Sequence, residues 1–302
     1  MANEWIFGFS ALAALLPALL LVHRGAFGAG GRSRRIYWAL MAVAVAGPVS
    51  WTLAQLGGGW RTGLSMALWL TISVTIVIFS CLAVLTRHGV RLTVLVLPYL
   101  FGLGVIAVIW SQAPERPLLG TAPEAWIGLH IAVSVLTYAL LTLAAVAGFA
   151  VFLQERALKH KRPRALNRQL PSVADAENLQ VSLLIASVIV LGAGLLTGMA
   201  TQYFETGSLL VLSHKTVFSL LAFAVIAALL LIHYRTGIGG RRAARLVLLA
   251  YLLLTLGYPG VKFVTDVLLA GDFAPEFHGA GARHSPSPAF CVGTALAAPH
   301  FH

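Results

Sequence analysis

The chain has 302 residues, of which 59% are hydrophobic and only 10% are charged, and its mean hydropathy is +0.86. So much apolar surface must be covered by lipid, which excludes a water-soluble globular protein and predicts an all-α bundle of helices that crosses the membrane several times. The formal net charge is +11, and the basic residues cluster in short segments between apolar runs, as membrane topology requires. We therefore expect contact with the lipid bilayer and no nucleic-acid partner.

Apolar stretches long enough to cross a bilayer, which takes about 20 residues, recur along the chain. They predict eight transmembrane helices, over Trp5–Val22, Ile36–Leu56, Gly63–Thr86, Leu92–Trp110, Glu124–Leu153, Leu179–Ala200, Leu209–Tyr234 and Ala244–Leu269. Pro48 and Pro98 fall inside two of these helices, where neighbouring helices can satisfy the freed backbone groups. No soluble domain interrupts the series, so residues 1–270 are predicted to form one transmembrane domain.

The last part of the chain has a different composition. Residues 271–302 are rich in Gly, Ala, Pro and Ser and carry four histidines and Cys291. This composition predicts a disordered tail. The spacing of its histidines matches no recognised set of metal ligands.

The distribution of Lys and Arg predicts the orientation. Sixteen of the 21 lie in the first, third, fifth and seventh connections, at Arg24, Arg32, Arg34, Arg35, Arg87, Arg91, Arg156, Lys159, Lys161, Arg162, Arg164, Arg168, Arg235, Arg241, Arg242 and Arg245. Cytoplasmic loops carry the excess of basic residues. We therefore expect a multi-pass protein of the bacterial cytoplasmic (inner) membrane with both termini outside the cytoplasm.

Two histidines stand at matched depths on this topology. His130 lies six residues, or roughly 9 Å of helix, inside Glu124. His214 precedes Arg235 by 21 residues, or roughly 31 Å, which places it close to the outer boundary. Both imidazoles are therefore expected near the outer face, on separate helices.

Two neutral imidazoles at one depth could ligate the iron of a heme b from opposite sides. Alternatively, each could form a hydrogen bond across helices. The ammonium group of Lys215 could bind a heme propionate, and Arg116 is a weaker candidate for the same role. Alternatively, the Lys215 side chain extends to the lipid headgroups.

The helix around His130 supplies further candidates for a cofactor site. Ser134 and Tyr138 follow at i+4 and i+8 and could line the pocket, or they could serve only in helix packing. Trp126 could stack on a porphyrin, although tryptophan is also common at membrane interfaces.

Several of these residues form a motif, WxxLHxxxSxxxY, present as Trp126, Leu129, His130, Ser134 and Tyr138. It resembles the signature of the cytochrome c assembly (CcsA-type) proteins, and in particular their YpjD/HemX-like branch. Similar segments follow at LPSVADAENL (170–179), LLTGMA (195–200) and SHKTVFS (213–219). The resemblance covers roughly Trp5 to Leu269 as architecture and Trp126 to Leu269 as motifs.

The resemblance implies heme handling in c-type cytochrome biogenesis, with His130 and His214 as heme ligands and other cytochrome c maturation membrane proteins as partners. Heme binding would need mainly an apolar cleft, two axial ligands and a cationic partner for the propionates, so we predict no catalytic acid, base or nucleophile and hence no enzyme. Larger family members present heme to apocytochrome on a tryptophan-rich external segment. The corresponding residues here, Thr201 to Leu212, contain no tryptophan, so a supporting, stabilising or regulatory role is open.

Two other functions are compatible with a helical membrane protein. An electron-transfer subunit with structural b-type heme would be expected to carry a second pair of histidines. His233 lies 19 residues after His214, but the helix of His130 offers no partner for it. A small-molecule transporter would be expected to have interrupted helices and paired charges within the membrane, of which Lys262 and Asp266 are among the few candidates.

Overall fold

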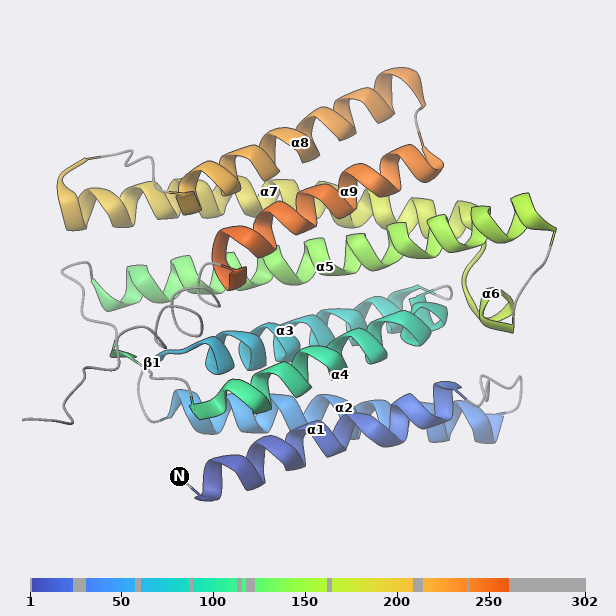
Figure 1. Ribbon diagram of the computed structural model, residues 1–302, viewed down its shortest axis with the longest axis horizontal. Coiled ribbons are helices and arrows are strands. Elements are labelled where there is room, and N and C mark those ends of the chain that lie inside the picture. The colour runs from blue at the N-terminus through green and yellow to red at the C-terminus, as the bar shows by residue number, and fades with distance from the viewer. Residues whose placement is uncertain are drawn as a thin grey trace, which may run out of the picture.

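The computed structural model is a bundle of long helices that run alternately in opposite directions (Figure 1). The structure describes residues 2–23, 31–57, 61–86, 89–112, 116–117, 123–161, 165–208, 214–237 and 239–260. The α-helices are α1 (Ala2–His23), α2 (Gly31–Leu56), α3 (Leu64–Leu85), α4 (Thr93–Ile109), α5 (Glu124–His160), α6 (Ala165–Gln169), α7 (Val173–Thr206), α8 (His214–Thr236) and α9 (Gly240–Thr255). The shorter elements are η1 (Gly89–Leu92), η2 (Trp110–Gln112), the π-helical turn η3 (Leu256–Gly260) and the paired strands β1 (Arg61–Thr62) and β2 (Arg116–Pro117).

The predicted polytopic helical fold is confirmed. Among the described residues, seven helices are long and apolar enough to cross a membrane, namely α1 to α5, α7 and α8. The eighth predicted span corresponds to α9, which has 16 residues and continues into η3. The remainder of that predicted span and the predicted tail, residues 261–302, lie outside the described residues.

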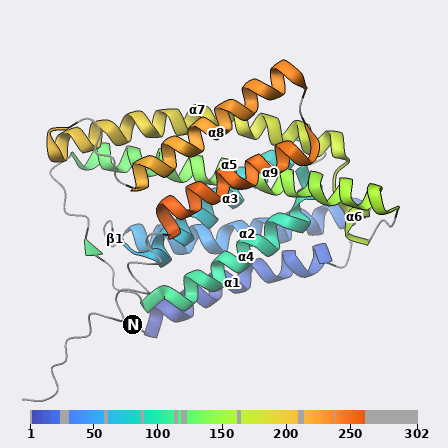
Figure 2. The ribbon, with the colours of Figure 1, turned by 45° about the horizontal axis from the view of Figure 1, so that its top comes forward.

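The seven long apolar helices and α9 form two groups, each with four helices that pack as a ring. In the N-terminal group, α1 packs on α2, α2 on α3, α3 on α4, and α4 on α1. In the C-terminal group, the corresponding order is α5, α7, α8 and α9, which returns to α5. The helix α5 also packs against α3 and lies between the two groups (Figure 1, Figure 2). Helices α5 and α8 therefore occupy diagonal positions in the C-terminal group.

Burial follows from this arrangement. In α5, 67% of the apolar span is buried within the protein, whereas in α8 only 22% is. The helix α5 thus serves as the central element, and α8 is the least buried of the seven long apolar helices that the structure describes. Hydroxyl pairs stabilise the N-terminal group across helices, because Tyr37 contacts Thr93 at 2.9 Å and Thr52 contacts Ser73 at 2.8 Å.

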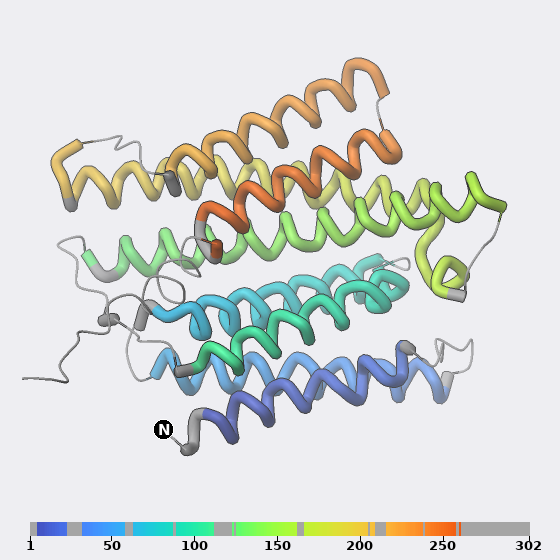
Figure 3. Tube along the Cα trace, in the orientation of Figure 1, coloured from blue at the N-terminus to red at the C-terminus, as the bar shows by residue number. Residues whose placement is uncertain are grey.

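Alternating directions give the bundle two distinct ends (Figure 3). We name the end at which α5 and α8 begin and α7 ends the histidine end. The opposite end, where α5 and α8 end and α7 and α9 begin, is the basic end. The basic end holds most of the exposed cations that the structure describes, among them Arg34, Arg156, Lys159, Arg168 and Arg245.

Four helices, α1, α2, α5 and α7, are longer than predicted, and α5 and α7 exceed the prediction most. The helix α5 continues to His160 instead of ending at Leu153, and α7 runs from Val173 to Thr206 instead of from Leu179 to Ala200. A hydropathy pattern marks only the segment solvated by lipid, whereas a helix can continue into water where its ends are capped. Ser172 provides such a cap, because its Oγ accepts a hydrogen bond from the Asp175 N–H at 3.2 Å.

At the basic end, side-chain hydrogen bonds and an ion pair hold the last turns of α5 to their neighbours. The Gln154 side-chain amide donates to the carbonyls of Asn167 at 2.9 Å and Pro171 at 3.0 Å. Glu155 pairs with Arg241 of α9 at 3.3 Å. These contacts bind α5 to the α6 segment and to the start of α9.

The start of α9 depends on a glycine. Gly240 has a φ of +61°, and its N–H donates to Glu177 of α7 at 2.9 Å. A Cβ at Gly240 would collide with the carboxylate of Glu155. The positive φ favours glycine at this position, and the Glu155 carboxylate would have to move to admit a Cβ.

Candidate functional site

His130 lies near the start of α5, and its ring is turned toward α7. The imidazole is half-buried, and its Nδ1 lies 3.0 Å from Oγ1 of Thr197. The Thr197 hydroxyl in turn donates to the carbonyl of Gly194 at 3.1 Å. A side-chain hydrogen bond between two helices of the C-terminal group therefore positions the ring.

Two glycines in α7 allow this close approach. A Cβ at Gly198 would lie 3.0 Å from Cε1 of His130, a spacing tighter than almost all real Cβ contacts. A Cβ at Gly194 would lie 3.5 Å from Val133, which is ordinary van der Waals contact. Small residues four positions apart let membrane helices pack closely. The surface of α7 that receives the imidazole is therefore shaped by glycine.

His214 and Lys215 are the first two residues of α8. Their side chains lie outside the described residues, so the predicted meeting of the two imidazoles stays a prediction. The backbone nevertheless places their helix diagonally across the ring from α5. In addition, α8 begins set back from the tips of α5 and α7 at the histidine end (Figure 3).

Trp126 lies one turn before His130 on α5. Its indole Nε1 is covered by protein and finds no hydrogen-bond acceptor among the described residues. Leaving a buried N–H unpaired costs about 1–3 kcal/mol, so a bound group that brings an acceptor would be favoured here. Ser134, one turn after His130, is exposed. Among the described residues, the site therefore has an indole donor without an acceptor and an exposed neighbour in Ser134, a combination compatible with a bound group that carries carboxylates.

Tyr138 faces a different neighbour from His130. Its hydroxyl lies 3.0 Å from Thr255 and 3.2 Å from Tyr251, both on α9. Tyr251 is also hydrogen-bonded to Tyr99 of α4. Tyr138 thus belongs to a tyrosine cluster (Tyr99, Tyr138, Tyr251 and Thr255) that connects the N-terminal and C-terminal groups.

Sequence reasoning missed the residues that hold these side chains. Thr197 and Gly198 stand within LLTGMA, and the pair Gly194 and Gly198 forms a GxxxG pattern that could have indicated a close helix contact. Tyr99 and Tyr251 carry no comparable local signal. Their contact depends on the packing of segments 152 residues apart.

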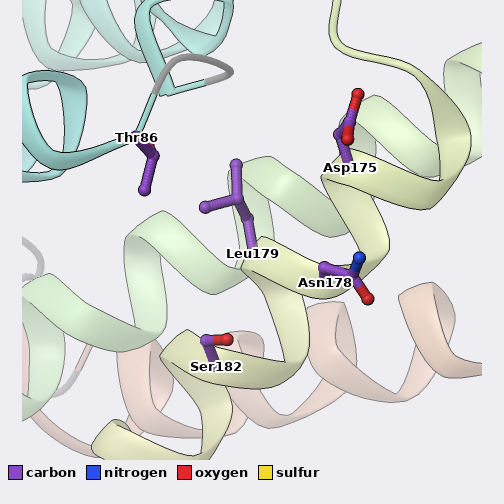
Figure 4. Close-up of a pocket in the computed structure, with 5 residues that line it drawn as sticks. All are labelled: Thr86, Asp175, Asn178, Leu179 and Ser182. Atoms are coloured by element: carbon purple, nitrogen blue, oxygen red, sulfur yellow. The ribbon is translucent and has the colours of Figure 1, made fainter.

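A small crevice lies near the opposite end of the bundle and is separate from this site. It has a volume of about 180 Å³ and is lined by Thr86, Asp175, Asn178, Leu179 and Ser182 (Figure 4). Thr86, just after α3, stands on one side, and the residues of α7 stand on the other. Within the described residues, no group of three or more His, Cys, Asp or Glu could hold a metal ion.

Comparison with known proteins identifies the family. A family profile described as "Cytochrome C assembly protein" matches residues 36–269. The chain belongs to the cytochrome c assembly protein family. This membership confirms the resemblance expected from the sequence motifs and supports a role in c-type cytochrome biogenesis.

Two relatives illustrate the range of this cytochrome c assembly protein's similarities. It is 55% identical over 270 residues to an uncharacterized 28.8 kDa protein in the nifR3-like 5′ region of Azospirillum brasilense, covering 89% of this chain and 100% of that protein. It is 28% identical over 178 residues to the inner membrane protein YpjD of Escherichia coli K12, covering 58% of this chain and 65% of YpjD. No solved structure matches. The chain is thus a multi-pass membrane protein homologous to an inner membrane protein.

Proposed function

We propose that this cytochrome c assembly protein binds heme b at the histidine end and thereby serves c-type cytochrome biogenesis. The observation that carries the proposal is the placement of His130, whose imidazole is fixed to α7 but only half-buried. A histidine that served only to join two helices would be expected to be enclosed between them. An imidazole that is fixed yet accessible is suited to a ligand.

The neighbouring residues have complementary roles in this proposal. When bound, heme supplies an iron atom that accepts axial imidazole ligands. His130 would provide one ligand from α5, and His214 would provide the other from the diagonal helix α8. The Nε1 of Trp126, which has no acceptor among the described residues, and the ammonium group of Lys215 would bind propionate oxygens.

The orientation of the protein is also part of the proposal. The exposed cations at the basic end would face the cytoplasm, and the histidine end would face outward. The connection between α7 and α8 is short, because α7 continues to Thr206, and its sequence contains no tryptophan. We therefore assign the chain a heme-holding or heme-supplying role beside other maturation proteins, without direct presentation to apocytochrome.

The charges that the structure describes favour this function over transport. Glu155, Arg241 and Glu177 form their contacts at the basic end, where α5 and α7 extend past the predicted spans. A transporter would be expected to place such pairs near the middle of the membrane.

The test is an absorption spectrum of the protein purified after expression with ample heme. Wild type should show a heme Soret band, and both His130→Ala and His214→Ala should reduce the heme content strongly. His233→Ala is the matched control, because His233 lies on α8 at the basic end. This control should retain its heme.

Two outcomes would count against the proposal in different ways. A wild-type protein without heme would refute heme binding altogether. A heme band of unchanged intensity and position in both alanine variants would refute the ligand assignment and leave another heme site to be found. Orientation is tested separately, by accessibility of single cysteines at Lys159 and Ser208 to a membrane-impermeant reagent in intact cells.

A further inference from the structure

The hydrogen bonds around Thr197 favour one of the two neutral tautomers of His130. A threonine hydroxyl has one hydrogen to donate and can accept through its lone pairs. The Thr197 hydroxyl donates to the carbonyl of Gly194 at 3.1 Å. While this bond is made, the same oxygen can only accept from Nδ1 of His130, 3.0 Å away. In that arrangement Nδ1 is the donor.

A neutral imidazole with its proton on Nδ1 carries its free lone pair on Nε2. We propose that Thr197 and Gly198 are positioning residues that fix His130 in this tautomer and direct Nε2 to the ligand. The inference rests on the proposed heme function and deepens it. Histidines that bind metals commonly donate their second ring N–H to a neighbouring oxygen, which orients the ring and makes the ligand nitrogen more basic.

Gly198 sets the position of the ring, as Thr197 sets its tautomer. The position of a Cβ at Gly198 is 3.0 Å from Cε1, 3.6 Å from Nδ1 and 3.7 Å from Nε2 of His130. The Cε1 edge of the imidazole thus rests on the glycine backbone. Alanine at this position would displace the ring from α7 and lengthen the hydrogen bond to Thr197.

The first measurement needs no heme. Heme-free protein labelled with ¹⁵N-histidine is studied in nanodiscs by long-range ¹H–¹⁵N NMR, at a pH where the ring is neutral, and His130→Ala identifies the signal of His130. We expect wild type to show protonated Nδ1 and unprotonated Nε2. An imidazole protonated on Nε2 would overturn the inference, whatever the behaviour of the variants.

The second measurement uses variants that separate positioning from packing. Thr197→Val keeps the shape but removes the acceptor, so the Nδ1–H preference should be lost and the affinity for added heme should fall about 10- to 100-fold. Thr197→Ser restores the hydroxyl and should recover both. Thr201→Val is the matched control, because the Thr201 hydroxyl donates only to the Thr197 carbonyl, at 2.8 Å, one turn along the same helix.

The outcomes distinguish this inference from the proposed function. If wild type binds no heme but shows the expected tautomer and its loss in Thr197→Val, the function fails and the role of Thr197 stands. If heme binds through His130 and Thr197→Val leaves both tautomer and affinity unchanged, the inference fails and the function stands. Gly198→Ala should weaken heme binding while Gly194→Ala, with ordinary contact distances, should have a smaller effect.

Discussion

The tyrosine cluster supports a quantitative prediction about stability. Tyr251→Phe removes the hydroxyl that bonds to both Tyr99 and Tyr138 and retains the ring, whose centroid lies 5.5 Å from that of Tyr138. Interhelical hydrogen bonds in membrane proteins contribute about 0.6 kcal/mol on average and up to about 1.7 kcal/mol. Loss of two should lower the free energy of unfolding by about 1–2 kcal/mol, which is roughly a tenfold change in the unfolding equilibrium constant.

The assay is reversible unfolding in mixed micelles with increasing mole fraction of a denaturing detergent, followed by circular dichroism. Tyr234→Phe is the matched control, because Tyr234 is 68% exposed and should tolerate the change. A double-mutant cycle between Tyr99→Phe and Tyr251→Phe should show a coupling energy of about 0.5 kcal/mol or more. Equal stabilities of Tyr251→Phe and the control, together with additive effects in the cycle, would refute a role for the cluster in joining the two groups.

Three further predictions concern the two ends of the bundle. Gly240→Ala should destabilise the protein more than Gly237→Ala in the same unfolding assay. Both glycines have positive φ, but only at Gly240 would the new Cβ collide with the Glu155 carboxylate. Equal losses of stability would show that the carboxylate moves aside freely. Trp126→Phe should leave the heme-free protein at least as stable, since it removes a buried N–H that has no acceptor among the described residues. The same change should weaken heme binding in a titration followed at the Soret band, and unchanged affinity would contradict the assigned role of the indole. Lys215→Gln should raise the dissociation constant of heme and make it less dependent on salt, whereas Lys215→Arg should not.

The positions of the membrane helices could be predicted from sequence because lipid imposes a minimum apolar length. Predicted and observed bounds agree within a residue or two at both ends of α3 and α4, where both ends coincide with the apolar pattern. They differ by five residues at the start of α2 and by more at the ends of α5 and α7. For α5 and α7, capping and side-chain hydrogen bonds in water extend the helix beyond its apolar segment. Gln154, for example, indicates that α5 continues past its apolar segment only once its contacts with the carbonyls of Asn167 and Pro171 are known.

The candidate site was predictable only in part. The pattern around His130 is local to one helix and can be recognised in the chain. The rotation of that helix, which turns His130 toward α7 and Tyr138 toward α9, depends on packing between distant segments. Thr197 is an ordinary helix residue in the sequence, and it acquires its role only because Gly194 and Gly198 bring the two backbones together.

The length of α5 has a mechanical consequence. At 37 residues the helix measures about 56 Å, nearly twice the roughly 30 Å of hydrocarbon in a bilayer. Near the basic end, the side chains of Gln154 and Glu155 bind α5 to its neighbours. Glu155 lies about 38 Å from His130 along the helix axis. A shift of α5 along its axis at the basic end would therefore change the height of the His130 ring at the histidine end.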